Sequence, residues 1–321
     1  MAPATRTLAA GLQVSPIGYG GWQAGGGATW GANQSARDVI AAIHAGLDAG
    51  MTWIDTAEVY GGGGGSETII GRAVARRPDT LVCTKVAPRP DGSGLRPADI
   101  AAAARASLRR LRRDTIDLYY VHWPDPDIDL AETWGAMAEL VYDGIARHIG
   151  LSTVHAQDVE RCHHAHPVAC VQLQGSALYL DELDGLGRWC AAHHIGVVAY
   201  GPLAFGLLAD PALAPRPHDD WRGGVIGQDD IFVRDNHARF FTPDARVRHQ
   251  PVIAAVARLA ADAGLTLPAL MIAWLLRHDS GPALLCGTRD RGHAVANARS
   301  AGIVLDGALA DAVTAAVRRQ P

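Results

Sequence analysis

The chain has 321 residues, of which 48% are hydrophobic and 19% charged, a composition that favours a packed globular protein over a disordered one. The formal net charge of −4 gives no support for binding to nucleic acid or to an anionic membrane surface. No apolar run approaches the roughly 18 residues of a membrane span, no secretory signal is recognisable, and the five cysteines form no CxxC pair. We therefore expect a cytoplasmic chain with reduced thiols and no metal site.

Strand-like and helix-like segments alternate along the chain after a short hairpin predicted between Thr5 and Ser15. The first helix is predicted from Ser35 to Ala49, and a last helix, about Asp306 to Arg318, is expected outside the main unit. Parallel strands are predicted at residues 16–22, 52–57, 81–86, 116–123, 145–152, 168–173, 196–201 and 282–287. Eight strands separated by helices predict one (β/α)8 barrel domain over residues 1–321.

One segment interrupts this alternation. Residues 209–250 are rich in Pro, Gly, Asp and Arg and have little periodicity, so we expect a long loop that covers the active site. A domain boundary is the alternative, but too little chain follows to build a second core. Beyond the loop, the spacing of Val252, Val256 and Leu259 predicts a helix that begins at Pro251.

The predicted carboxyl ends of the strands, where barrel enzymes carry their chemistry, hold polar or aromatic residues. Tyr60 follows Asp55 by five residues and would reach the same rim. Any one of these residues has an ordinary explanation, such as a helix cap, but their shared placement indicates an active site. The strand-end residues are Trp22, Asp55, Lys85, His122, Ser152, Gln172, Tyr200 and the run Gly287-Thr288-Arg289.

Four of these residues suggest how a carbonyl is reduced. A free tyrosine titrates near pH ~10 and is a weak acid at neutrality. We expect the Lys85 ammonium to lower the pKa of Tyr60, and Asp55 to keep Lys85 charged. His122 would hydrogen-bond the substrate carbonyl. A tyrosine that donates a proton beside a hydride donor performs carbonyl reduction.

Asp55, Tyr60, Lys85 and His122 resemble the catalytic tetrad of the aldo-keto reductases. The segments "GMTWIDTAEVYG", "LRRDTIDLYYVHWPDP" and "VVAYGPLAFGLL" are also similar to motifs of this family, and the resemblance extends from about residue 10 to 318. It implies the branch that includes bacterial general reductases and potassium-channel β subunits. An NADPH-dependent reductase of small aldehydes or ketones is therefore expected, with an NADP(H)-binding, redox-sensing regulatory subunit of little turnover as the alternative. A non-redox barrel, such as a sugar isomerase, would leave Lys85 and Tyr60 without a role.

The resemblance also implies where NADPH or NADP+ binds. Ser152 and Gln172 would hold the nicotinamide carboxamide, Tyr200 would stack on the ring, and the loop 201–208 would wrap the pyrophosphate. Thr288 and Arg289 would hold the 2′-phosphate. The other implied contacts are Gly21, Trp22, Thr153, Gly201, Pro202, Leu203, Gly206, Leu208, Gly287, His293 and Asn297.

Several positions depart from the family pattern. Thr153 stands where asparagine is usual, Gly175 is expected to enlarge the pocket near the nicotinamide, and Ala296 is expected to loosen adenine binding. The five-glycine run 61–65 is expected to be mobile, with Ser66 capping the next helix. The stretch "RCHHAHPVAC" lacks the spacing of a structural zinc site and is interpreted as an exposed helix end.

Overall fold

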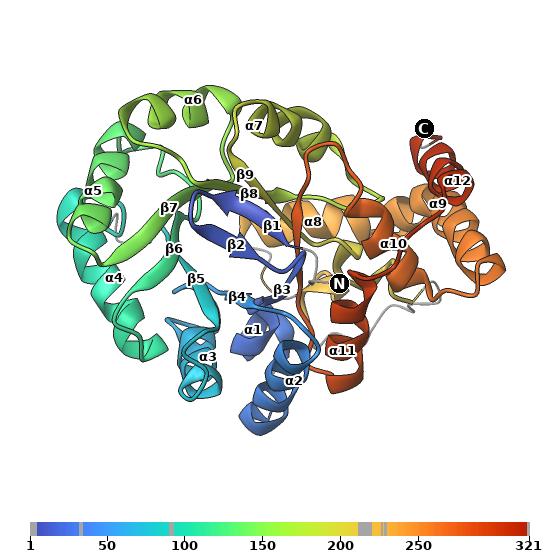
Figure 1. Ribbon diagram of the computed structural model, residues 1–321, viewed down its shortest axis with the longest axis horizontal. Coiled ribbons are helices and arrows are strands. Elements are labelled where there is room, and N and C mark those ends of the chain that lie inside the picture. Colours follow the sequence, from blue (N-terminus) through green and yellow to red (C-terminus); the bar gives the residue numbers. More distant parts are fainter. Residues whose placement is uncertain are drawn as a thin grey trace.

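The predicted barrel is confirmed. The computed structural model describes residues 5–31, 35–89, 93–210, 220–225, 227 and 230–319. Its eight parallel strands close in the order β10-β3-β4-β5-β6-β7-β8-β9 (Figure 1). The strands are β3 (Ile17–Gly20), β4 (Trp53–Asp55), β5 (Leu81–Val86), β6 (Ile116–Val121), β7 (Ala146–Ser152), β8 (Cys170–Gln174), β9 (Gly196–Tyr200) and β10 (Ala283–Cys286).

Helices form the outer layer around these strands (Figure 1). Several begin at a side-chain cap; Asp306, for example, accepts a hydrogen bond from the amide of Leu309 at the start of α12. The helices of this layer are α2 (Ala36–Asp48), α3 (Gly65–Val74), α4 (Pro97–Leu111), α5 (Leu130–Tyr142), α6 (Ala156–Ala165), α7 (Arg188–Ala192), α9 (Pro243–Asp262), α10 (Leu267–Leu275), α11 (Arg291–Ser300) and α12 (Gly307–Arg318).

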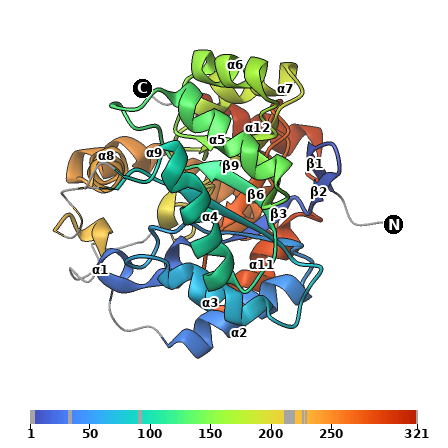
Figure 2. The ribbon, with the colours of Figure 1, turned by 90° about the vertical axis from the view of Figure 1, so that its left-hand side faces the viewer.

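The N-terminal hairpin closes one end of the barrel. Its strands, β1 (Arg6–Ala9) and β2 (Leu12–Val14), place Leu8 and Leu12 in one apolar cluster with Trp53 and Tyr120 from inside the barrel. Figure 2 shows the hairpin at one end of the molecule and α1 (Gly27–Trp30) and α8 (Ile231–Phe240) at the opposite end. Apolar packing therefore closes one end of the barrel, and we look for the active site at the opposite end.

Large aromatic rings fill the barrel interior opposite glycines. A Cβ atom on Gly18 would lie 2.3 Å from the Trp53 ring, and one on Gly150 would lie 2.8 Å from the Tyr120 ring. Both rings are fully buried. The glycines thus make room for side chains that fill the closed end, as a densely packed interior requires.

We expected a long loop over residues 209–250, but most of the part of this segment that the structure describes is helical. It contains a short 3-10 helix at Trp221–Gly223, the helix α8 and the start of α9. The helix α9 begins at Pro243 rather than at Pro251, because the Thr242 hydroxyl accepts a hydrogen bond from the amide of Ala245 and caps an earlier start. Residues 211–219, 226 and 228–229 lie outside the described part of the chain.

No single helix within the described ranges is both long and apolar enough to cross a membrane. The pair α9 and α10 passes that test only when the two helices are taken together, and they meet at an angle of 99°.

Packing between the hairpin and the barrel can be tested at Gly196. A Cβ atom there would lie 2.3 Å from the carbonyl oxygen of Leu8 and 2.7 Å from its Cα, and backbone atoms cannot move aside by changing rotamer. We expect Gly196→Ala to lower the free energy of unfolding by about 1–3 kcal/mol, measured by urea denaturation. Gly135→Ala is the control: nothing lies within 4 Å of its Cβ position in α5, so it should stabilise by about 0.5–1 kcal/mol. Equal effects of the two variants would contradict the packing argument.

Candidate active site

Neighbouring strands bring the four residues of the predicted tetrad to one rim of the barrel. Asp55 ends β4, and Lys85 lies near the end of β5, which pairs with β4 in parallel. His122 directly follows β6, and Tyr60 lies in the loop after β4. The carboxyl ends of consecutive parallel strands meet at one edge, so residues distant in sequence become neighbours.

A buried ion pair lies beneath this rim. Lys85 is fully buried and Asp55 is 2% exposed. The Lys85 ammonium donates hydrogen bonds to Asp55 Oδ1 and, over 2.7 Å, to the carbonyl oxygen of Thr56. Gln172 Nε2 donates to the other carboxylate oxygen, Asp55 Oδ2, over 3.0 Å. Lys85 is also the only lysine in the chain.

Burial raises the pKa of Asp55, while the charge and hydrogen bonds of Lys85 and the hydrogen bond from Gln172 act in the opposite direction. Every partner of the carboxylate therefore favours its ionised form against the cost of removing it from water.

Tyr60 and His122 contact each other above the pair. The phenolic oxygen of Tyr60 lies 3.3 Å from His122 Nε2, and Lys85 Nζ lies 5.1 Å from the centre of the Tyr60 ring. A carbonyl oxygen that meets the tyrosine hydroxyl would therefore also meet the imidazole.

The expected direction of the Tyr60 pKa shift is wrong for this structure. Burial raises the pKa of Tyr60 well above 10, and the negative charge of Asp55 raises it further. The physical reason is first the burial of the Tyr60 hydroxyl and then the charge of Asp55, while the hydrogen bonds of the Lys85 ammonium go to Asp55 and to the Thr56 carbonyl.

His122 is neutral in this environment. Burial and the neighbouring positive charge of Lys85 lower the pKa of His122 well below 6.5. Its Nδ1 atom is buried and makes no hydrogen bond to the described residues. The Trp123 ring, whose centre lies 4.6 Å from that of His122, forms part of the apolar surroundings.

The residues assigned to the nicotinamide end lie on the next three strands. Ser152 ends β7 and pairs in register with Gln172 of β8, and Tyr200 ends β9. Because Gln172 also contacts Asp55, these residues lie next to the tetrad. Thr153 has a φ of +56°, a conformation that asparagine adopts readily and a β-branched residue rarely does. The departure from asparagine at this position therefore strains the backbone rather than only exchanging one polar group for another.

The residues assigned to the phosphates lie in two loops at the same rim. Residues 201–208 turn tightly, with positive φ at Gly201 and Gly206, and contain a short 3-10 helix at Ala204–Gly206. Pro202 and Leu208 are buried in this loop, and Leu203 is half-buried.

The second phosphate loop precedes α11. The side chain of Thr288 accepts a hydrogen bond from the amide of Asp290 (3.1 Å), and Arg289 Nη1 donates to the carbonyl oxygen of Trp30 over 2.9 Å. His293 donates its amide to the Asp290 side chain, which caps α11, and Asn297 is buried one turn further on. Gly287 lies close to β3, since a Cβ atom there would be 2.8 Å from the carbonyl oxygen of Gly20.

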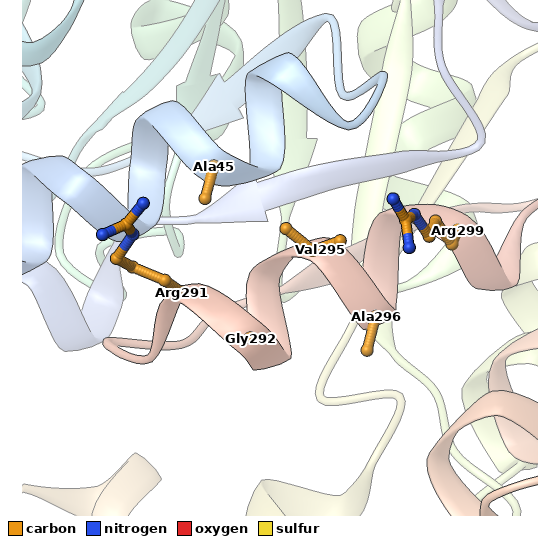
Figure 3. A pocket seen from close by; sticks show the side chains of 6 residues that line it. All are labelled: Ala45, Arg291, Gly292, Val295, Ala296 and Arg299. Atoms are coloured by element: carbon orange, nitrogen blue, oxygen red, sulfur yellow. The ribbon is translucent and has the colours of Figure 1, made fainter.

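A shallow hollow of about 690 Å³ lies on the outer surface between α2 and α11. Figure 3 shows Arg291 and Arg299 extending from α11 at its two ends, with Ala45 facing them from α2. Ala296 is part of its lining, so the small side chain at this position leaves the helix surface open.

The structure gathers an aromatic cluster around Trp22; the part of it that sequence reasoning missed is the ring of Phe232, because the segment that holds α8 was predicted as a loop. The Trp22 ring lies 4.9 Å from Trp30, 6.0 Å from Phe205, 5.7 Å from Trp221 and 5.5 Å from Phe232, measured between ring centres. The buried positions Val233, Asn236 and Phe240 repeat at helical spacing and were the available signal for α8.

Two further expectations about the rim are wrong. Gly175 does not enlarge the pocket, because Leu183 fills the space: a Cβ atom on Gly175 would lie 2.4 Å from Leu183 Cδ1. Ser66 does not cap α3; Gly64 occupies the capping position, and Ser66 Oγ donates to the carbonyl oxygen of Gly21 over 2.7 Å. The serine is used to join two loops at the rim.

The histidine-rich stretch 161–170 forms the end of α6 and the start of β8, with Cys162 and Cys170 buried. Within the described ranges no group of three or more His, Cys, Asp or Glu side chains is arranged to hold a metal ion.

The barrel and its rim constellation identify the class of protein. The sequence profile described as the Aldo/keto reductase family matches residues 16–318, so the chain belongs to that family, and the resemblance stated from the motifs is confirmed.

Individual relatives cover nearly the whole chain. Aldo-keto reductase str7 of Strobilurus tenacellus is 30% identical over 303 residues, which span 91% of this chain and 85% of the relative. The structure of the glycerol dehydrogenase AKR11B4 from Gluconobacter oxydans aligns over 100% of this chain and 97% of its own, with 28% identity and a TM-score of 0.82. An aldo-keto reductase from Klebsiella pneumoniae, solved in complex with NADPH, covers 100% and 96% with 29% identity and a TM-score of 0.75.

The ion pair can be tested by breaking it from one side. Lys85→Met should lower the free energy of unfolding by about 3–5 kcal/mol, because it leaves the Asp55 carboxylate buried without its counter-ion. The double variant Lys85→Met/Asp55→Asn should regain part of that loss, which urea denaturation of the variants and the wild type will measure. If the loss of stability in the double variant equals the sum of the losses in Lys85→Met and Asp55→Asn alone, the carboxylate is not held by this lysine.

The neutral state of His122 can be followed by NMR titration of the labelled imidazole. The ring should stay neutral as the pH falls past 6.5, with His122→Gln used to assign its signals. The unfolded chain takes up this proton near pH 6.5 but the folded chain only at lower pH, so the contribution of His122 makes the free energy of unfolding fall as the pH decreases below about 6.5. Protonation at or above 6.5 would contradict the burial argument.

Proposed function

We propose that this protein is an NADP(H)-dependent oxidoreductase that reduces the carbonyl group of an aldehyde or ketone to an alcohol. The observation that carries the proposal is the contact of 3.3 Å between the Tyr60 hydroxyl and His122 Nε2 above the buried Lys85–Asp55 pair. Family membership and the NADPH complex of the Klebsiella pneumoniae relative support it.

The residues at the rim fit an NADP(H) molecule. Ser152 and Gln172, 2% and 3% exposed, provide hydroxyl and amide groups for a carboxamide, and the Tyr200 ring provides a stacking surface. The glycines of the 201–208 loop allow backbone amides to approach a pyrophosphate closely. Thr288 and Arg289 lie before the N-terminus of α11, where a phosphate is stabilised by a guanidinium and by the helix dipole.

The cofactor supplies a hydride when it is bound; the chain supplies the proton and the positioning. Tyr60 is protonated at neutral pH, as a free tyrosine with a pKa of ~10 already is, and burial raises its pKa further, so it enters reduction as a hydrogen-bond donor to the carbonyl oxygen. It gives up its proton only as negative charge builds on that oxygen, since an alkoxide is a stronger base than a phenolate.

The other tetrad residues support this transfer. His122, being neutral, can donate a hydrogen bond from Nε2 to the carbonyl oxygen without competing for its proton. The Lys85 ammonium, 5.1 Å from the centre of the Tyr60 ring, places a positive charge near the phenolate that remains, and Asp55 keeps the ammonium in place.

Contacts made by the segment that begins at Asp220 support the idea that this segment covers the rim. Arg222 Nη1 donates to the carbonyl oxygen of Phe205 over 3.1 Å, and Arg222 Nη2 pairs with Asp220 at 2.6 Å. The Arg222 guanidinium also lies 5.3 Å from the centre of the Trp30 ring. We propose that this segment covers the cofactor, as expected for the 209–250 region.

The decisive variant is Tyr60→Phe, which removes only the hydroxyl. Quenching of tryptophan fluorescence by NADPH should be preserved, because the cofactor-holding residues lie on other strands. Oxidation of NADPH with an aldehyde and ketone panel should fall by about 10²–10⁴-fold, the range expected for the loss of a general acid. Near-normal turnover by the variant would rule out Tyr60 as the proton donor.

Turnover measurements on the wild-type protein distinguish the reductase from the regulatory subunit. Turnover of the panel with release of NADP+ supports the reductase. Retention of NADP(H) with negligible turnover would instead favour the redox-sensing regulatory subunit.

A further inference from the structure

The loop that carries the proposed proton donor contains glycines of two different kinds. Gly62 and Gly63 form its tip, and nothing lies within 4 Å of the Cβ position of either residue. Gly61 and Gly64, on either side of this tip, are packed tightly: a Cβ atom on Gly64 would lie 2.2 Å from Arg110 Nε, and one on Gly61 would lie 2.6 Å from the carbonyl oxygen of Gly25. The loop is therefore packed on both sides of its tip and has open space at Gly62 and Gly63.

The contact between Gly25 and Gly61 joins two backbones directly. A Cβ atom on Gly25 would lie 2.7 Å from the Cα and the nitrogen of Gly61 and 2.9 Å from the carbonyl carbon of Tyr60. Side chains could move away from such an atom by changing rotamer, but these neighbours are main-chain atoms. An added methyl group at Gly25 must therefore push the backbone of Tyr60 and Gly61 away.

Hydrogen bonds hold the same two segments together on either side of this contact. The amide of Gly21 donates to the carbonyl oxygen of Asp55 over 2.7 Å, and Ser66 Oγ donates to the carbonyl oxygen of Gly21, also over 2.7 Å. The amide of Ser66 donates to the carbonyl oxygen of Tyr60 over 3.1 Å and closes the glycine loop. The turn after β3 and the tyrosine loop thus form one packed unit.

We propose that Gly25 and Gly61 are positioning residues, and that their backbone contact sets the distance between the Tyr60 hydroxyl and His122. The consequence for catalysis rests on the function proposed above. Both residues lie outside the tetrad, and the mobility expected of the whole glycine run is restricted to its tip, Gly62 and Gly63. The chain between Asp55 and Ser66 can then vary at the tip without moving the tyrosine.

Gly25→Ala tests this proposal most cleanly. The φ angle of Gly25 is not positive, so alanine brings no conformational strain of its own and only the contact is tested. We expect kcat to fall by about 100-fold, the effect of displacing a reacting group by roughly 1 Å. In a crystal structure of the variant, the Tyr60 hydroxyl should lie beyond hydrogen-bonding distance of His122 Nε2, and this readout does not depend on activity.

Two matched glycines provide the controls. The φ of Gly65 is not positive, and a Cβ atom there would make only van der Waals contacts, 3.7 Å from the carbonyl oxygen of Gly25 and 3.8 Å from that of Tyr60. Gly65→Ala should therefore keep kcat within about threefold of the wild type. Gly62→Ala has a φ of +73° but open space around it, so it shows the effect of backbone strain without the contact. A loss of kcat in Gly25→Ala no larger than in these controls would overturn the proposal.

A double variant separates positioning from general damage. If Gly25 acts through Tyr60, adding Gly25→Ala to Tyr60→Phe should cost little further activity, whereas two independent defects would multiply. Multiplied losses would contradict the proposal. If Tyr60→Phe itself keeps normal activity, the proposed function fails. The proposal about Gly25 is then decided by the crystal structure of Gly25→Ala: an unmoved Tyr60 hydroxyl refutes it, and a displaced one supports it.

Discussion

The rim of this barrel depends on the ion pair between Lys85 and Asp55. Removing two charges from water is costly, and the structure offsets the cost with hydrogen bonds from Gln172 and to the Thr56 carbonyl. Asp55 and Thr56 lie at the end of β4, Lys85 on β5 and Gln172 on β8, so the pair is satisfied only when these three strands are part of the closed barrel. The barrel that this register defines is what places Tyr60 and His122 over the pair.

One end of the barrel contributes to stability, and the other end carries the candidate active site. At the closed end, the hairpin and the rings of Trp53 and Tyr120 fill the interior with apolar contacts. At the open end, buried polar groups stay in a dry environment, where burial raises the pKa of Tyr60 and lowers that of His122. A protonated phenol and a neutral imidazole are the forms that suit binding a neutral carbonyl. The same burial therefore prepares both groups before a substrate arrives.

Predictions from residue type and order held wherever periodicity was regular. The eight strands and the residues at their ends follow from alternating apolar segments, and the motifs around Asp55 and His122 indicated the family. The prediction failed at 231–240, where Pro and Gly nearby suggested a loop although buried residues repeat at helical spacing. It failed also at Ser66 and Gly175, because the partners that decide their roles, Gly21 and Leu183, come from other parts of the barrel.

The sequence by itself determined the order of strands and helices, the chemical groups at the strand ends and the family to which the chain belongs, since these depend on local pattern. Tertiary structure decided the direction of the Tyr60 pKa shift, because that shift depends on burial and on the position of Asp55 relative to the ring. It also decided which glycines are packed: the sequence does not distinguish five consecutive glycines, whereas in the structure Gly25 lies against Gly61 and Arg110 against Gly64, and Gly62 and Gly63 have open space around them.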